Sequence, residues 1–205
     1  ALALCASNHE GISVDKYRQH VAKVIHDTGR RHAELIDAGA DDDAGTQLAA
    51  LKYVLSDREG YAGDTGHYDD LQNADLMRVI DRRKGMPIAL CLLYIHVGRA
   101  CGWVLDGLNF PGHFLCRIEK GGARIIFDPF HACKVMEASS LRALIKDVRG
   151  PNAELSVDYY QACSNRDLLI RLQNNIKLRL IEGEDYRGAL AEVERMRLLA
   201  PMEYR

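Results

Sequence analysis

The segment that decides the fold is residues 85–100, which read GMPIALCLLYIHVGRA. Apolar side chains surround this segment on every side, a pattern typical of a helix that is buried by its neighbours. Pro87 suits the first position of such a helix, because its missing N–H would have had no partner there. Gly102 follows as a helix stop. We therefore predict a central buried helix that runs from Pro87 to about Arg99.

Three short segments after this helix are rich in apolar, β-branched or aromatic residues, and turns containing glycine separate them. They predict three consecutive strands over residues 103–110, 113–119 and 123–128. Because a buried helix and a small antiparallel sheet must cover each other's apolar faces, the fold class expected is α+β.

The hairpin between the last two strands brings a histidine and an aspartate together. If the turn is Lys120-Gly121, then His113 lies directly opposite Asp128, with their β-carbons roughly 5 Å apart. If the turn is Gly121-Gly122, the pairing shifts by two residues. The two side chains still share a face, because side-chain direction alternates with a period of two. Either register predicts a His-Asp pair on one face of the sheet.

Helical spacing of apolar residues also predicts helices on both sides of this core. One or two helices start near Asp15, a helix capped by Thr46 ends before Gly60, and a helix capped by Asn73 follows. Two more helices meet around Gly183, after an irregular stretch. We divide the chain into a domain over residues 1–160 and a C-terminal helical hairpin over residues 161–205.

Charge and composition exclude several classes of partner. The formal net charge is -2 and no long basic block is present, which argues against nucleic acid. No apolar stretch approaches the ~20 residues of a membrane span, and the opening residues lack the basic region of a signal peptide. The six cysteines show no CxxC spacing, which indicates a reducing, cytoplasmic compartment.

Two groups of potential metal ligands are present in the sequence, but neither has the complete set of ligands that a metal site requires. The segment Asp41-Asp42-Asp43 resembles the start of a calcium loop, but Lys52 stands where the loop needs a bidentate glutamate. His131-Ala132-Cys133 lies near Asp128 without a second spaced pair of ligands. We expect no metal and no cofactor.

Several motifs resemble those of one family and follow in that family's order. They are Gly85-Met86-Pro87, the segment GLNFPGHF at residues 107–114, and Phe127-Asp128-Pro129-Phe130. These motifs and the buried helix resemble the transglutaminase-like superfamily, specifically its SirB-type branch. The resemblance covers nearly the whole chain and is densest over residues 71–130. It implies a papain-like core with helices before it and a helical hairpin after it.

The resemblance also assigns the site residues. In catalytic members a cysteine begins the buried helix, a histidine begins a strand and an aspartate ends the next one. Those positions are Pro87, His113 and Asp128 here, and proline has no nucleophilic atom. Cys91, one helical turn further on, is the candidate substitute nucleophile. Alternatively, Cys91 is a core residue whose thiol has a raised pKa. Cys116 points away from the His-Asp face and is expected in the core.

The function expected is therefore that of a non-catalytic regulatory or scaffolding protein, with a degenerate groove for a peptide or small ligand. The alternative is a hydrolase or acyltransferase that uses His113 and Asp128 with a displaced thiol such as Cys91, or with an activated water. The pair could also serve structure alone. Residues 183–201 resemble one tetratricopeptide repeat, and the alternative is a plain helical hairpin. Protein partners are expected at the groove or at these helices.

Overall fold

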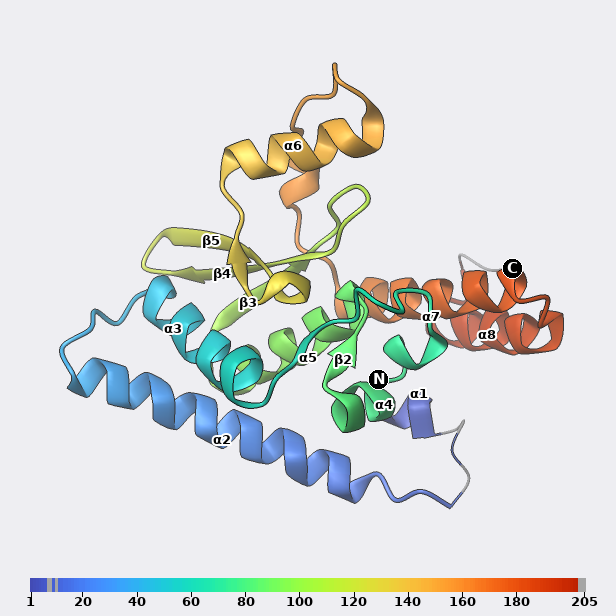
Figure 1. The fold of residues 1–205 in the computed structure, drawn as a ribbon, viewed down its shortest axis with the longest axis horizontal. Coiled ribbons are helices and arrows are strands. Elements are labelled where there is room, and N and C mark those ends of the chain that lie inside the picture. Colours follow the sequence, from blue (N-terminus) through green and yellow to red (C-terminus); the bar gives the residue numbers. More distant parts are fainter. Residues whose placement is uncertain (7–8, 10, 203–205) are drawn as a thin grey trace.

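The helix that begins at Pro87 lies at the centre of the fold, between a layer of helices and an antiparallel sheet (Figure 1). The computed structural model describes residues 1–6, 9 and 11–202. The central helix, α5, spans Pro87–Ala100, and nine of its residues are buried. This confirms the predicted core helix and the α+β fold class.

The sheet that covers α5 has four strands in the order β3-β4-β5-β6. Its strands are β3 Val104–Leu108, β4 Leu115–Lys120, β5 Ala123–Asp128 and β6 Lys134–Val135. All three predicted strands are present. The first is shorter at both ends, the second begins two residues later and ends one residue later, and the third has the predicted bounds. The two-residue strand β6 and a parallel pair of two-residue strands, β1 Ala62–Gly63 and β2 Lys84–Gly85, had no signal in the sequence pattern.

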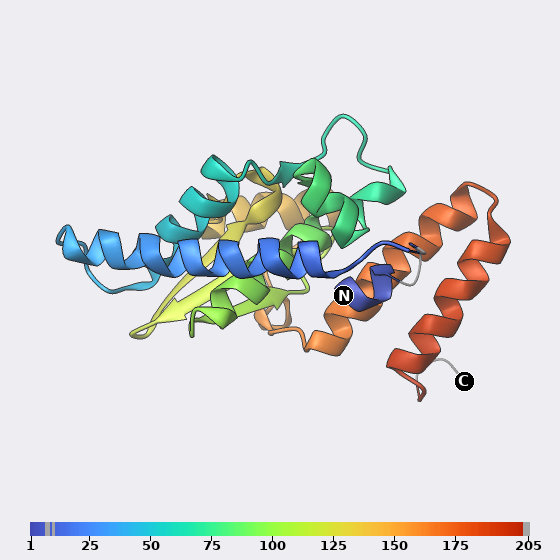
Figure 2. The same cartoon turned by 90° about the horizontal axis from the view of Figure 1, so that it is seen from below.

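Helices cover the other side of α5. This layer contains α1 Leu2–Ala6, α2 Asp15–Asp37, α3 Ala44–Leu51, the π-helix η1 Lys52–Arg58, the 3-10 helix η2 Leu71–Asn73 and α4 Leu76–Arg82. In Figure 2, α2 crosses the whole width of the core as one continuous helix. Of the two arrangements left open for this segment, the single helix is therefore present.

Aspartates cap α3 and α4, and the predicted caps of these two helices, Thr46 and Asn73, are wrong. Asp43 caps α3 by accepting from the backbone N–H of Thr46 at 2.8 Å. Asp75 caps α4. Asn73, the predicted cap, lies two residues earlier in the chain and is buried. Asp15 is the first residue of α2 and not its cap. Asp43 and Asp75 have the extended backbone that a capping residue requires.

The two faces of the sheet are covered by different elements. Cys116, Ile118 and Phe127 point into the main core that surrounds α5. Leu115 points the other way, into a second and smaller core cluster. This alternation follows from the period-two geometry of a strand. Both faces of the β4–β5 hairpin are therefore packed.

The second cluster depends on α6 Ala138–Arg149, a helix that the sequence analysis missed. Figure 1 shows α6 above the far face of the sheet. Its buried residues are Leu141 and Ile145, and Leu144 packs partly against the same cluster. The spacing of these leucines and isoleucine was a helical signal. The 3-10 helices η3 Pro129–His131 and η4 Val157–Tyr160 flank this part of the chain.

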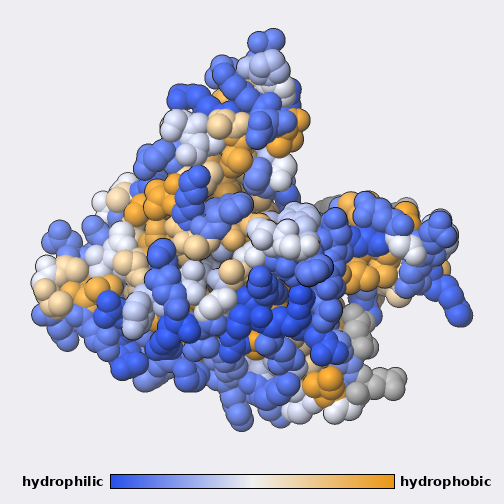
Figure 3. Space-filling model, in the orientation of Figure 1, coloured by the Kyte–Doolittle hydropathy of each residue, from blue (hydrophilic) through white to orange (hydrophobic). Residues whose placement is uncertain are grey.

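The chain closes with the predicted pair of helices, α7 Asn165–Glu182 and α8 Tyr186–Leu199. Ser164 begins α7 with a reciprocal capping box to Asp167. Leu168 and Leu172 of α7 belong to the main core, whereas α8 packs along α7. Apolar side chains of the hairpin stay exposed, and Figure 3 shows apolar surface there and over the sheet below α6.

None of the helices within the described ranges is both long enough and apolar enough to cross a membrane. The apolar helix α5 has 14 residues, well below the ~20 that a bilayer requires. Its hydrophobicity is explained by its central position in the core.

A buried carboxylate on α2 predicts acid sensitivity of the helical layer. Lys23 donates to Asp27 at 2.8 Å, and Lys23 and Arg58 together lower the pKa of Asp27 to about 2. A lowered pKa stabilises the fold above the unfolded-state pKa of ~3.9, and this contribution disappears as the pH falls toward 2. We expect unfolding titrations to show a loss on the order of 1 kcal/mol between about pH 4 and 2. Asp27→Asn should abolish this acid-induced decrease in the free energy of unfolding. Asp147→Asn, a control at an exposed aspartate, should still show it.

Candidate functional site

The start of α5 is held in place from both sides. The parallel pair of β1 and β2 leads directly into it, and the N–H of Met86 donates to the carbonyl of Asn73 at 3.0 Å. Pro87 occupies the first helical position and is half-buried. The N–H groups of the first turn have no intrahelical partner, as at every helix start. A side chain at position 87 therefore lies at the positive end of the helix dipole and within reach of solvent.

The hairpin register settles which of the two predicted turns forms. Lys120 pairs with Ala123, so the turn is Gly121-Gly122, and both glycines have positive φ. The Lys120-Gly121 alternative, which placed His113 directly opposite Asp128, is wrong. Glycine tolerates the left-handed conformation that this turn needs, whereas Lys120 would be strained in it.

His113 lies just outside the strand that was expected to contain it. Strand β4 begins at Leu115, and the N–H of His113 donates to the carbonyl of Phe110 in a turn. Because strand alternation applies only inside a strand, it does not determine where the His113 side chain points. No hydrogen bond or ion pair involves that side chain within residues 1–6, 9 and 11–202. The pairing of His113 with Asp128 remains a prediction.

The histidine that contacts Asp128 is His131. Nδ1 of His131 donates to Asp128 Oδ2 at 2.7 Å, and the N–H of Phe130 donates to Oδ1 at 2.9 Å. Asp128 is buried, whereas the side chain of His131 is 55% exposed. The bond at Nδ1 leaves Nε2 of the exposed ring available for a proton. From the sequence, His131 was predicted only as a possible metal ligand, and its pair with Asp128 was not predicted.

A local signal could have identified the Asp128–His131 pair. Proline after an aspartate favours a tight turn, and Asp128 caps the short helix η3 through the N–H of Phe130. In a 3-10 helix, side chains three residues apart lie one above the other. The sequence Asp128-Pro129-Phe130-His131 therefore places the imidazole over the carboxylate. In the part of the chain that the structure describes, no group of three or more His, Cys, Asp or Glu side chains could hold a metal ion.

A cation from α7 reaches the turn that carries His113. Arg171 donates from Nη2 to the His113 carbonyl at 3.4 Å, and its guanidinium carbon lies 5.1 Å from the centre of the Phe114 ring. Burial lowers the pKa of Arg171. The described residues offer no carboxylate within ion-pair distance of this guanidinium. A half-buried arginine without an acidic partner leaves positive charge at this end of the sheet.

The thiol considered as a substitute nucleophile is deep in the core. Cys91 has no exposed surface, and its sulfur lies 3.5 Å from the carbonyl oxygen of Phe114. Desolvation, followed by contact with the Cys116 thiol, raises the pKa of Cys91 well above its ordinary value. Cys116 is also fully buried and belongs to the main core, as predicted.

The other thiols are no better suited to nucleophilic chemistry. All six cysteines are free, and burial raises the pKa of each of them. The pKa of Cys5 rises to about 11 and that of Cys133 to about 12. Because the thiolate is the reactive form, none of these cysteines is activated near neutral pH.

Removing the Asp128 carboxylate should show what the pair contributes to structure. Asp128→Ala loses the cap of η3 and the partner of His131, so we expect a loss of about 1–2 kcal/mol in the free energy of unfolding. Asp128→Asn keeps a capping oxygen and should lose less. Urea titration of the two variants measures the difference. Equal stability of Asp128→Ala and the wild type would show that the cap has no structural role.

Comparison with known proteins agrees with the architecture. Residues 15–174 match the model of the Transglutaminase-like superfamily. The match covers well over half of the 205 residues, and the chain belongs to this superfamily. The buried helix, the antiparallel sheet and the positions of Pro87, His113 and Asp128 all lie inside the matched range. No solved structure matches the chain.

Curated relatives fall into two groups. A UPF0162 protein of Xylella fastidiosa (strain 9a5c) is 32% identical over 133 residues, which cover 63% of this chain and 47% of the relative. A UPF0162 protein of Pseudomonas aeruginosa is 30% identical over 169 residues, covering 82% and 61%. The F-box only protein 21 of Mus musculus is 39% identical over 84 residues, covering 40% and 13%. The chain spans about half the length of the UPF0162 proteins that it matches.

Proposed function

We propose that this chain is a non-catalytic, regulatory or scaffolding member of the superfamily with a degenerate Cys-His-Asp site. The observation that carries the proposal is the state of its thiols. Proline occupies the nucleophile position at the start of α5, and burial raises the pKa of every cysteine in the chain. Acyl transfer through a thioester needs a thiolate within reach of the substrate. The chain supplies none.

The site that remains has features of a binding groove. Pro87 and His113 are half-buried, and Arg171 brings an unpaired positive charge to the His113 turn. These features favour a peptide or small ligand with a carboxylate, since a guanidinium binds carboxylates in a matched geometry. Binding of such a ligand requires no nucleophilic side chain.

The C-terminal hairpin supplies the second proposed contact surface. Leu178, Tyr186 and Leu190 are exposed large apolar side chains on its two helices. Exposed apolar clusters on helices often mark protein interfaces. We assign residues 161–205 to a tetratricopeptide-like unit that packs on the main core through α7 and binds a protein partner. SirB-type membership, a cytoplasmic location and the absence of nucleic-acid and membrane partners complete the proposal.

A second candidate function rests on the Asp128–His131 pair. A buried carboxylate that orients an exposed imidazole is the general-base part of a hydrolytic site, and the base could activate water without a thiol. In this alternative the chain is a hydrolase that uses Asp128 with His131, or with His113 and a displaced thiol such as Cys91. The favouring observation is the free Nε2 of an exposed, carboxylate-bound histidine.

Steady-state assays distinguish the two functions. The wild type is incubated with activated esters and with glutamine-containing peptides, and release of product is compared with buffer. The non-catalytic proposal predicts no turnover above background for the wild type or for His131→Ala and His113→Ala. Turnover that disappears in His131→Ala and persists in His113→Ala would establish the hydrolase. Turnover lost in Cys91→Ala would instead assign a thiol nucleophile.

A further inference from the structure

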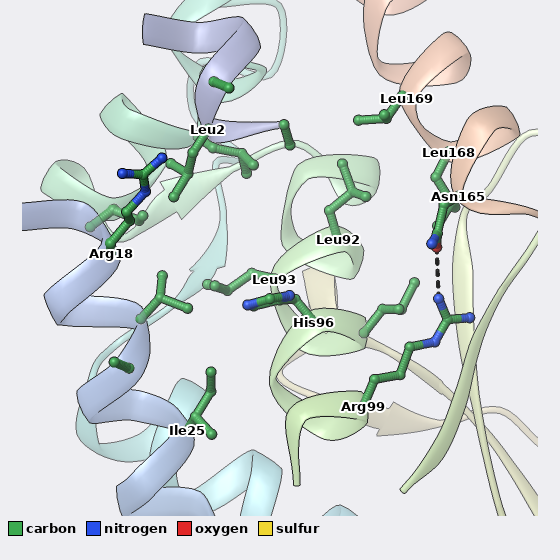
Figure 4. Close-up of a pocket in the computed structure, with 17 residues that line it drawn as sticks. Leu2, Arg18, Ile25, Leu92, Leu93, His96, Arg99, Asn165, Leu168 and Leu169 are labelled. Atoms are coloured by element: carbon green, nitrogen blue, oxygen red, sulfur yellow. Dashed lines mark hydrogen bonds between the residues drawn. The ribbon is translucent and has the colours of Figure 1, made fainter. Parts of the chain in front are cut away.

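A cavity lies on the side of α5 that faces away from the sheet. It has a volume of about 670 Å³ and opens between α1, the N-terminal half of α2, α4, α5 and the first turn of α7 (Figure 4). Cys91 and Tyr94 of α5 face the sheet, where the Tyr94 ring lies 6.2 Å from that of Phe127. The cavity is therefore separate from the candidate site. Its volume falls within the roughly 300–1,000 Å³ range of small-molecule sites.

Aliphatic side chains form most of the cavity wall. They come from five helices: Leu2 of α1, Val21 and Ile25 of α2, Leu76 and Ile80 of α4, Leu92 of α5, and Leu168 of α7. Figure 4 shows Ile25, Leu92 and Leu168 around the open space. A hydrocarbon chain that covers this apolar wall would bind favourably. Each buried methylene contributes about 0.8 kcal/mol of binding free energy, which is about a fourfold gain in affinity.

Among the described residues, all the ionisable side chains that line the cavity are basic. They are Arg18, His96 and Arg99. Arg99 is already occupied, because it donates to Asp106 at 2.6 Å and to Asn165 at 2.7 Å. Arg18 has a side chain that is 67% exposed and one weak ion pair, at 3.5 Å, with a neighbour on its own helix. His96 is exposed, and no hydrogen bond or ion pair holds its ring within the described part of the chain. Arg18 and His96 are therefore available to a ligand.

We propose that this cavity binds a fatty acid, with the hydrocarbon chain along the aliphatic wall and the carboxylate at Arg18 and His96. The apolar wall would contact the hydrocarbon chain, and the basic groups at the rim would attract the anionic head. The arrangement requires no movement of α5, because the cavity is already open. This inference goes beyond the proposed function and does not depend on the Pro87 site.

The ligand test is a calorimetric titration that measures affinity and stoichiometry. The full chain is titrated with saturated fatty acids of 8 to 14 carbons, each below its critical micelle concentration. We expect one molecule per chain and an affinity that rises about fourfold per methylene until the cavity is full. Dodecanol, which lacks the charge, should bind at least fivefold more weakly than dodecanoate. Dodecyltrimethylammonium should bind more weakly still. Equal binding of the three would contradict the headgroup assignment.

Paired variants test the location. Ala22→Trp fills the cavity from the exposed side of α2, and Ala33→Trp makes the same change on the same helix away from it. We expect at least tenfold loss of dodecanoate binding in the first and none in the second. Arg18→Glu should weaken dodecanoate but not dodecanol, whereas Arg142→Glu on α6 should change neither. Absence of saturable binding by the wild type, or binding unchanged by Ala22→Trp, would overturn the proposal.

Discussion

Replacing Pro87 with cysteine is expected to create the most reactive thiol in the chain. The new side chain stands at the first position of the 14-residue helix α5, where unpaired N–H groups favour an anion. Its position is half-buried, unlike that of the fully buried Cys91. If the pKa falls from ~8.5 to about 7, the thiolate fraction at pH 7 rises by roughly fifteenfold. Alkylation by iodoacetamide, followed by peptide mapping, measures the rate against the native thiols.

Three further variants identify what activates the introduced thiol. Ala138→Cys places a cysteine at the first position of α6, an exposed helix start that controls for the dipole alone. Adding His113→Ala to Pro87→Cys should slow alkylation if His113 contacts the helix start, as the superfamily pattern implies. Adding His131→Ala tests the histidine that binds Asp128. A Pro87→Cys thiol that titrates like Ala138→Cys and responds to neither histidine would refute the degenerate-triad assignment.

Gly63→Ala is expected to cause the largest loss of stability among the variants considered. A β-carbon at Gly63 would lie 2.5 Å from the Phe130 ring, far inside van der Waals contact. Phe130 is buried, and its ring also meets Tyr68 edge-on at 5.8 Å. Neither strand β1 nor η3 has space to absorb the methyl group without a shift. We expect a loss of about 1–3 kcal/mol in the free energy of unfolding.

Gly66→Ala is the matched control for this prediction. Gly66 lies three residues further along the same segment, and a β-carbon there would meet nothing within 4 Å. Guanidinium titrations should therefore show Gly66→Ala close to the wild type. Because Phe130 precedes His131, Gly63→Ala should also broaden or shift the His131 ring signals in NMR spectra. A Gly63→Ala variant as stable as Gly66→Ala would show that β1 can move away from Phe130 at no cost.

The sequence was most informative where one physical signal dominated. The apolar surface of α5 and the proline at its first position predicted the helix to within one residue at its end. The hairpin was predicted with two registers, and the choice depended on which residues tolerate positive φ. The structure selects Gly121-Gly122, where both residues are glycine. A preference for glycine at both turn positions would have given the correct register from the sequence.

Polar contacts were harder to predict than packing. Asp43 and Asp75 cap helices where Thr46 and Asn73 were expected, because a cap depends on backbone geometry at a single residue. The partner of Asp128 was sought across the hairpin, but a local turn supplies His131 three residues away. Local hydrogen bonds of this kind compete with long-range pairing and are invisible to strand alternation.

Covalent trapping of the wild-type chain tests the central claim most directly. The protein is incubated near neutral pH with an electrophilic acyl substrate, quenched in acid and measured by intact mass, with the Pro87→Cys variant treated in parallel. The claim that the site is degenerate predicts an unmodified mass for the wild type. Proline cannot form an acyl intermediate, and the native thiols are buried or half-buried and have raised pKa values. A stoichiometric acyl adduct on the wild type, mapped to Cys91 or another native cysteine, would contradict it.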